Sequence, residues 1–465
     1  MALKASSPNA SRSPSSSSSP LLTLTLAFIA WKSFILLLSC GGALVGPGYD
    51  TSTSLFFARS SSSSSSSSSA TLLARRLTRW DAIYFVHAAR GGINGSRAPV
   101  YEQQWAFSPA LSLFLQWLAA QARRTSSILG RLPLNDGRTE DDDLEALAGI
   151  ALAHASHAVA VFTLHRLTLL LTGGDARRAL LAALLCVISP AGVFLSAPYA
   201  ESPFAALSFA GVWVLAAGYE DPLGSARRSA AVLAAGAVLG LATAVRSNGL
   251  ANGLLFAVEA LRAAGAFVKA PGVKLAVAAG VAGVGGVLVA MGSAIPQYVA
   301  YTIYCGGGGD ERAAVMRPPW CERTVPSIYS YVQDVYWNVG FLRYWTPNQI
   351  PLFLLAAPVL TLLIASGYEV LRRPAAGGFA LSSLDHRVLV QALAASQAIV
   401  ALLALTSYHV QVISRLASGY AVWYWWIAAC LMDKSRRGVG RAAVIFMVMY
   451  GGIQAVLFST FLPPA

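Results

Sequence analysis

The residue best suited to chemistry is Asp81, in the string Trp80-Asp81-Ala82-Ile83-Tyr84 after the first long hydrophobic segment. A carboxylate is costly to keep in hydrocarbon, so we expect it on the water side of a membrane boundary, at the mouth of a cavity. Partial desolvation there would make it a stronger base, able to take a proton from a hydroxyl group. A second interpretation is that Asp81 caps a helix N-terminus beside an interfacial tryptophan.

A second group of polar residues interrupts two apolar runs. Pro190 and Pro198 lie there together with Tyr199 and Glu201. Helices that break inside a membrane line cavities that are buried in protein or filled with water. The alternative is a tight turn in which Glu201 is hydrated.

Arginines follow two other apolar segments. Arg246 precedes Asn248, and Arg415 follows His409 and Gln411. A guanidinium suits a phosphate because it can donate two parallel hydrogen bonds. Arginines that snorkel to the interface would look the same. If both faced Asp81 on one side of the membrane, they would form a site for an anionic, lipid-linked donor.

An aromatic and amide-rich run covers residues 326–351 and includes Asp334, Trp337 and Asn338. Flat aromatic faces suit sugar stacking, but the same composition suits an interfacial amphipathic helix. Nearer the first segment, Asp50 is interpreted either as a catalytic or acceptor-binding residue or as a turn residue.

The composition is that of a membrane protein. Of 465 residues, 55% are hydrophobic and 12% are charged, against about 25% charged in soluble domains. The net charge is +13, but the basic residues gather in short loops between apolar runs, as the positive-inside rule predicts. This pattern argues against nucleic-acid binding.

The apolar segments predict an all-α polytopic membrane protein with about eleven transmembrane helices. Twelve segments stand out: 21–45, 106–121, 147–171, 179–195, 200–217, 230–247, 250–265, 275–294, 350–370, 388–407, 416–432 and 442–462. Loop charges place the N-terminus in the cytosol and residues 46–105, 295–349 and 408–415 on the other side. The alternation of basic and non-basic loops along the chain fails once, around segment 147–171. Either 147–171 therefore dips in and returns, or 106–121 does not cross. Within the first segment, Lys32 must snorkel or face the bundle interior.

The chain divides into residues 1–20, expected to be disordered and cytosolic, and a membrane domain over 21–465. The Ser60–Ser69 homopolymer within loop 46–105 is expected to be a disordered insert. Asn94 is a glycosylation sequon in that loop. Cys305 and Cys321 share loop 295–349 and would form a disulfide in an oxidising lumen, or else stay as free thiols. No phosphate loop, dinucleotide fingerprint or zinc spacing is present in the sequence, and no metal site is expected.

Seven strings in order resemble the PIG-V family of GPI mannosyltransferases, in its fungal branch, from about residue 25 to the C-terminus. They begin at Trp80, Ser189, Val245, Pro319, Tyr329, Gln349 and His409. The resemblance implies a GT-C-like bundle in the endoplasmic reticulum membrane, with a lumenal active site. It also implies transfer of the second mannose, in α1,6 linkage, from dolichyl phosphate mannose to the GPI precursor glycolipid. No cofactor or metal is implied, and a small accessory membrane subunit is plausible by analogy.

The resemblance assigns the acidic catalytic role to Asp81. We predict a single inverting displacement in which Asp81 takes the acceptor proton, while Arg246 and Arg415, with His409, neutralise the departing phosphate. Asp50, Glu201 and Asp334 would bind sugar hydroxyls. The alternatives are another lipid-donor transferase of the GT-C class, a transporter or flippase, and a non-catalytic membrane subunit.

Overall fold

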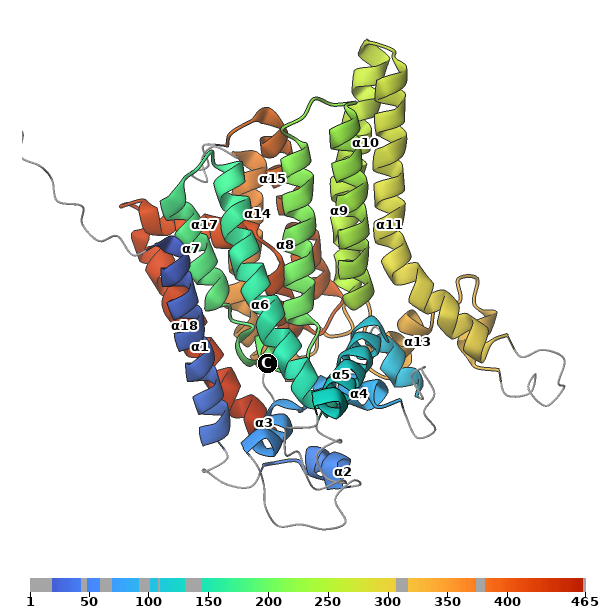
Figure 1. Ribbon diagram of the computed structural model, residues 1–465, viewed down its shortest axis with the longest axis vertical. Coiled ribbons are helices and arrows are strands. Elements are labelled where there is room, and N and C mark those ends of the chain that lie inside the picture. The colour runs from blue at the N-terminus through green and yellow to red at the C-terminus, as the bar shows by residue number, and fades with distance from the viewer. Residues whose placement is uncertain are drawn as a thin grey trace, which may run out of the picture.

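The computed structural model describes residues 19–42, 48–58, 69–91, 101–107, 109–129, 144–306, 317–373 and 381–462, and within these ranges it is helical without strands (Figure 1). Nine of the described helices are long and apolar enough to cross a membrane. Seven are single helices: α1 (Pro20–Gly41), α6 (Leu144–Leu171), α8 (Glu201–Gly218), α9 (Ala226–Val245), α11 (Val273–Tyr304), α15 (Leu384–Thr406) and α18 (Arg437–Ser459). The other two include a preceding 3-10 turn: η4 with α10 (Gly253–Lys269), over Ser247–Lys269, and η6 with α14 (Ile350–Arg372), over Pro347–Arg372. The predicted all-α polytopic fold is confirmed.

The count of eleven crossings is not confirmed, because two predicted segments form short helices. Helix α7 (Ala176–Val187) has 12 residues and α17 (Val422–Met432) has 11, against the roughly 20 that span a bilayer core. The helical geometry stops after α7 near Pro190 and resumes as η3 (Gly192–Leu195). Before α17 the chain forms three short pieces: η7 (Val410–Val412), α16 (Ile413–Leu416) and η8 (Ala417–Gly419). Both interruptions lie beside the site described below.

Helix length and hydropathy favour the option in which segment 106–121 does not cross. Helix α5 (Pro109–Leu129) is not among the candidate spans, whereas α6 runs through 28 residues without interruption. Polar residues in α5, Gln116, Gln121, Arg123 and Arg124, lower its hydropathy. Arg123 Nη2 lies 2.6 Å from Glu145 Oε1 at the start of α6.

Several helices outside the set of spans gather at one end of the bundle, which we call the site end (Figure 1). They are α2 (Ser52–Ala58), α3 (Ser69–Leu77), α4 (Asp81–Ala89), α5 and α13 (Ile328–Val335), with the 3-10 turns η1 (Glu102–Ala106) and η5 (Pro319–Glu322). The turns η4 (Ser247–Asn252) and η6 (Pro347–Gln349), which begin two of the spans, lie at the same end. A disulfide joins Cys305, which follows α11, to Cys321 in η5. It packs in a small cluster with Trp105 and Trp320.

Helices α9 and α11 pack closely because glycines face each other between them. A Cβ atom on Gly236 would lie 2.8 Å from Gly285 Cα, and one on Gly292 would lie 2.2 Å from the Gly240 carbonyl oxygen. Small residues let membrane helices approach at backbone distance. This packing fixes the end of α9, where Arg246 follows, against α11.

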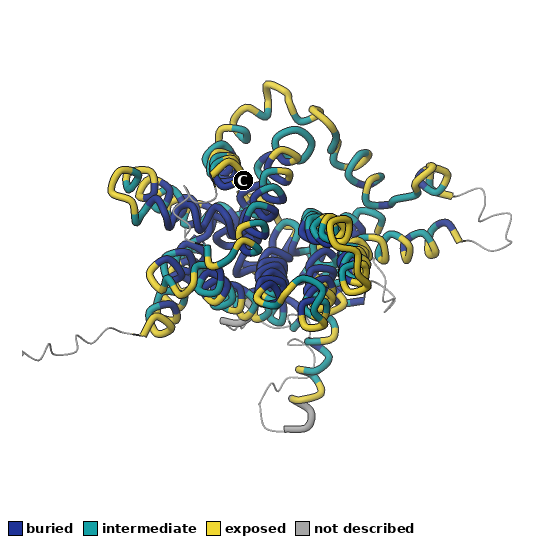
Figure 2. Tube along the Cα trace, turned by 90° about the horizontal axis from the view of Figure 1, so that it is seen from above, coloured by how far each residue is buried: buried dark blue, intermediate teal, exposed yellow. Residues whose placement is uncertain are grey.

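Buried residues concentrate along the middle of the bundle, with exposed residues on its outer turns (Figure 2). Lys32 lies in this interior, with 5% of its surface exposed. Its ammonium donates to the Leu195 carbonyl oxygen at 2.6 Å and contacts Ser196 Oγ at 3.0 Å. Of the two predicted positions for Lys32, the structure therefore selects the bundle interior.

At the end opposite the site, an ion-pair network joins three helices. Arg228 of α9 donates to Glu259 of α10 at 2.8 Å and to Asp385 of α15 at 2.5 Å. Arg262 also pairs with Asp385. Because each charge has an opposite partner, the network holds these helices together without leaving an unpaired buried charge.

Candidate functional site

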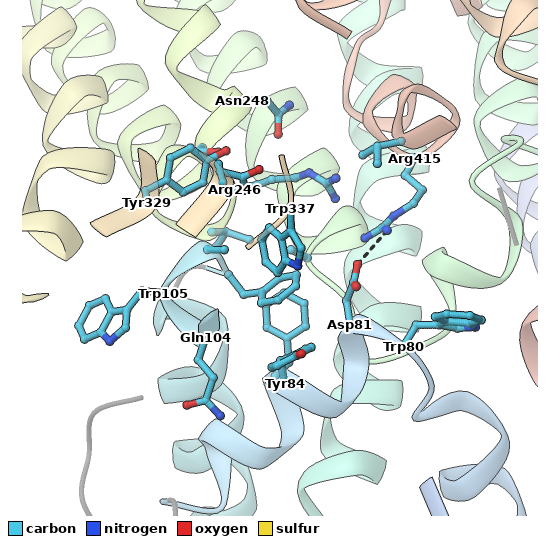
Figure 3. A pocket seen from close by; sticks show the side chains of 18 of the residues that line it. Trp80, Asp81, Tyr84, Gln104, Trp105, Arg246, Asn248, Tyr329, Trp337 and Arg415 are labelled. Atoms are coloured by element: carbon cyan, nitrogen blue, oxygen red, sulfur yellow. Dashed lines mark hydrogen bonds and ion pairs between the residues drawn. The ribbon is translucent and has the colours of Figure 1, made fainter. Parts of the chain in front are cut away.

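A cavity of about 780 Å³ opens at the site end. Its walls come from α4, η1, the start of α8, the residues after α9, α11, α13 and the interrupted segment before α17 (Figure 3). The lining includes Asp50, Trp80, Asp81, Glu201, Arg246, Asn248, Trp337, His409, Gln411 and Arg415. Residues that are hundreds of positions apart in the sequence therefore share one polar cavity.

Asp81 is the first residue of α4, and its carboxylate is turned to a partner across the cavity. The residue at the N-cap position is Trp80, which makes no side-chain capping bond. Asp81 Oδ2 accepts a hydrogen bond from Arg415 Nη1 at 2.9 Å, and 31% of the Asp81 side chain remains exposed. The geometry thus favours a role in the cavity over the alternative of a helix cap.

The backbone at Trp80 is strained. Its φ is 55° and its ψ is −128°, a region that a side chain with a Cβ rarely adopts. Such strain costs on the order of 1–3 kcal/mol and is maintained by the surrounding structure. The Trp80 ring lies 5.6 Å from Phe461, centroid to centroid. This contact helps to hold the turn that presents Asp81.

Glu201 is completely buried and joins the two arginines. Its Oε1 accepts from Arg415 Nε at 2.6 Å and from Arg246 Nη1 at 2.5 Å, and its exposure is 0%. Within the described part of the chain, Glu201 Oε2 has no hydrogen-bond partner. The geometry therefore differs from the expectation that Glu201 binds sugar hydroxyls: its carboxylate holds the guanidinium groups in place.

Arg415 is held by two carboxylates and two aromatic rings. Its guanidinium lies 4.6 Å from the Phe194 ring centroid and 4.9 Å from that of Tyr199. Burial by itself would lower the pKa of Arg415, but the Glu201 and Asp81 carboxylates outweigh it and raise that pKa above its ordinary value. Arg415 therefore stays cationic at every physiological pH.

Tyr199 itself does not line the cavity. Its hydroxyl donates to the Arg79 carbonyl oxygen at 3.0 Å, two residues before Asp81. The predicted substrate-binding role of Tyr199 is thus replaced by support, since its ring lies against Arg415 and its hydroxyl holds the turn before α4.

His409 and Gln411 both form hydrogen bonds with other parts of the protein. His409 Nε2 lies 2.9 Å from the Trp337 carbonyl oxygen, and its ring stacks on Tyr344 at 4.7 Å. Gln411 accepts a hydrogen bond from the Tyr344 hydroxyl at 3.1 Å. His409 lines the cavity, and its Nε2 also holds the backbone that carries Trp337, so its expected contact with the departing phosphate stays a prediction.

The remaining predicted residues divide between the cavity and its surroundings. Asn248 lines the cavity, and its Nδ2 donates to the Tyr420 hydroxyl at 3.1 Å. Asp50 lies at the rim, where its Oδ1 accepts from the backbone and hydroxyl of Ser52 at 2.6 Å. These two bonds hold the pKa of Asp50 below its usual value. The turn interpretation fits Asp50.

Asp334 and Asn338 do not line the cavity. Asp334 pairs instead with Arg343 and Arg323 on the surface, so the sugar-binding role expected of Asp334 does not fit its position. Asn338 has a φ of 52°, which suits its place in a tight turn after α13. The sequon at Asn94 and the serine run over residues 60–68 lie outside the described residues.

Sequence reasoning named Trp337 but missed its aromatic neighbours in the cavity wall, Tyr84 and Phe107. The rings of Tyr84 and Phe107 are stacked 5.1 Å apart, and Trp337 meets Phe107 at 5.5 Å. Burial, with the Asp81 carboxylate nearby, raises the pKa of Tyr84. The spacing of Tyr84 three residues after Asp81 was a usable signal, since such residues share a helix face.

An apolar groove of about 240 Å³ adjoins the cavity. It lies between α5 and α11, and the two spaces share Trp105, Pro109, Gly292 and Pro296. Its other lining residues are apolar as well: Ala110, Leu113, Ala244, Met291, Ile295 and Val299. The groove therefore offers hydrocarbon contact next to a cationic site.

Comparison with known proteins identifies relatives over almost the whole length. The family described as Mannosyltransferase (PIG-V) matches residues 22–465. GPI mannosyltransferase 2 of Gibberella zeae is 47% identical over 451 residues, which cover 96% of this chain and 98% of that protein. GPI alpha-1,6-mannosyltransferase 2 of Rattus norvegicus is 32% identical over 399 residues, with 77% of this chain and 74% of that protein covered.

Among solved structures, the oligosaccharyltransferase AglB of Archaeoglobus fulgidus is similar with a TM-score of 0.49 and 12% sequence identity. The match covers 94% of this chain and 56% of that one.

Proposed function

Because this chain belongs to the PIG-V mannosyltransferase family, we propose that it transfers a mannose in α1,6 linkage to a GPI precursor glycolipid, as the second mannose of the anchor. The proposed donor is dolichyl phosphate mannose, and the proposed location of the site is the lumenal side of the endoplasmic reticulum membrane. The names of the fungal and rat relatives support this assignment. The observation that carries it is the chain of charges Asp81–Arg415–Glu201–Arg246 in the cavity.

Asp81 acts as the general base. The Asp81 carboxylate takes the proton from the acceptor hydroxyl. At the same time, the hydroxyl oxygen attacks the anomeric carbon of the donor mannose. The new C–O bond forms as the bond from the anomeric carbon to the phosphate oxygen breaks. Dolichyl phosphate leaves with the bonding electron pair, the proton stays on Asp81, and the anomeric configuration inverts.

Arg246 and Arg415 stabilise the leaving phosphate. The contacts among the described residues use Nη1 of Arg246 and Nε and Nη1 of Arg415. The other guanidinium nitrogens keep N–H groups that can donate to phosphate oxygens. These donors are already held in place by Glu201, so little reorganisation is needed as charge develops. A phosphate is also a good leaving group and needs no general acid.

The apolar groove beside the cavity supports a lipid donor. A polyprenyl chain must leave the cationic site without exposing its hydrocarbon to water. The groove between α5 and α11 starts where the cavity ends, at Trp105 and Pro296. It would accommodate the isoprene units nearest the phosphate.

The Asp81→Asn variant tests the proposal in cells that lack the second GPI mannose step. We expect wild type to restore the step and Asp81→Asn to accumulate the glycolipid with one mannose, because the amide cannot accept the proton. General-base catalysis contributes roughly 10²–10⁴-fold, so microsomal transfer should fall by at least that factor. Lipid intermediates resolved by mass spectrometry provide the measurement.

Comparable membrane levels and thermal unfolding of the two proteins serve as the control. Near-normal transfer by Asp81→Asn would remove the general-base assignment, and failure of wild type to restore the step would remove the proposed reaction.

A further inference from the structure

The cavity has two walls of different chemistry. One, called the cationic wall, contains Arg246 and Arg415 with the single Glu201 carboxylate that joins them; the other is aromatic and contains Tyr84, Phe107 and Trp337. In Figure 3, Asp81 lies between the two, beneath Arg415 and beside Tyr84 and Trp337. A reaction at Asp81 would therefore take place where the walls meet.

The aromatic wall is held from several directions. Tyr84 and Phe107 are close to parallel, with an interplanar angle of 22°. Trp337 lies edge to face against Phe107, and its carbonyl oxygen is held by His409. Despite this packing, 37% of Tyr84 remains exposed. Leaving a large aromatic side chain partly open inside a supported cavity suggests a ligand that covers it.

We propose that this aromatic wall is the binding subsite for the reacting sugar of the acceptor. This inference rests on the proposed function, which supplies the carbohydrate and the role of Asp81. A pyranose has one face of C–H groups and a rim of hydroxyls. The C–H face covers aromatic carbon and removes apolar surface from water, while the hydroxyls reach polar groups at the edge.

A polar group is available at that edge. Gln333 of α13 lines the cavity, and its amide has no hydrogen-bond partner among the residues that the structure describes. An amide offers both donors and an acceptor and therefore matches a sugar hydroxyl, which can also do both.

The register of α4 places the acceptor, rather than the donor phosphate, on this wall. Asp81 and Tyr84 are three residues apart and share a helix face. A hydroxyl that donates to Asp81 therefore brings its own sugar ring next to Tyr84. The donor phosphate is drawn to the opposite, cationic wall. The two substrates then meet with the anomeric carbon between them.

The test measures separate KM values for dolichyl phosphate mannose and for a synthetic glycolipid that ends in one mannose. We expect Tyr84→Ala and Trp337→Ala each to raise the acceptor KM about tenfold, a change of about 1.4 kcal/mol. The donor KM should stay within about twofold, because the cationic wall is unchanged. The control is Phe341→Ala, which removes an exposed aromatic ring that does not line the cavity and should leave both KM values within about twofold of wild type.

An unchanged acceptor KM in both alanine variants would overturn the subsite, and a rise in the donor KM alone would assign the wall to the donor sugar. If Tyr84→Ala does not fold, as judged by thermal unfolding, Trp337→Leu replaces it, since leucine keeps apolar volume without a flat face. An unchanged acceptor KM in Trp337→Leu would equally overturn the subsite. Absence of transfer by wild type would contradict the proposed function instead.

Discussion

At the scale of single residues, the organising group of the site is Glu201. It is buried without exposure and accepts from both arginines through one oxygen. Two guanidinium groups this close would repel each other without a carboxylate between them. Removing one partner of a buried ion pair leaves an uncompensated charge, at a cost of roughly 3–5 kcal/mol. Glu201 is thus a positioning residue, because it acts through Arg246 and Arg415.

We predict that Glu201→Gln lowers kcat by about a hundredfold and reduces the thermal stability, because both arginines lose the charge that fixes them. Transfer assays at saturating donor, together with thermal unfolding in detergent, provide the measurement. The matched control is Asp334→Asn, which removes a surface ion pair outside the cavity and should leave kcat within about twofold of wild type. Wild-type kcat in Glu201→Gln would contradict the positioning role.

At the scale of elements, the site depends on where helices stop. The segment between α7 and α8 supplies Phe194 and Tyr199 to Arg415, and the segment before α17 supplies Arg415 itself. Lys32 of α1 donates to the Leu195 carbonyl oxygen, which also accepts from the Ser202 hydroxyl at 3.1 Å. The first helix therefore holds the interruption that leads directly into Glu201.

From this contact we predict that Lys32→Met inserts into the membrane but loses about tenfold in kcat, because the carbonyl of Leu195 loses its hydrogen-bond donor on α1. The donor KM should change little, since both arginines remain. Steady-state kinetics on microsomes of equal enzyme content measure both values. Lys32→Arg should recover part of kcat, and Thr25→Val, an exposed change on the same helix, should match wild type. A normal kcat in Lys32→Met would show that α1 does not position the site.

At the scale of the whole molecule, the reacting groups share one end of the bundle. The Asp81–Arg415 contact joins positions 334 residues apart, and the ion-pair network of Arg228, Glu259 and Asp385 lies at the opposite end. Both substrates must therefore reach the enzyme from the same side of the membrane.

New glycosylation sequons at the two ends of the bundle would show which end faces the lumen. In an Asn94→Gln background, Glu322→Asn creates a sequon with Thr324 at the site end, and Leu223→Asn creates one with Ser225 at the opposite end. We expect a glycosidase-sensitive increase in mass for the first variant and none for the second, because glycans are added in the lumen. Glycosylation of the second variant without the first would place the cavity in the cytosol and contradict the proposed donor orientation.

The sequence alone determined the class of the protein and several parts of its site. Hydropathy predicts membrane helices because the cost of burying each residue in lipid is local and adds along the chain. The string around Asp81 and the arginines after the apolar segments could be recognised for the same reason: each is a short pattern at a helix end.

The tertiary structure alone decided which residues meet. Only packing showed that Glu201 joins Arg246 to Arg415, that His409 supports Trp337, and that α5 lies at the site end of the bundle. The physical reason is that these contacts form between segments far apart in the sequence. Their partners depend on how the helices pack around a common cavity, and no local pattern of residue types records that arrangement.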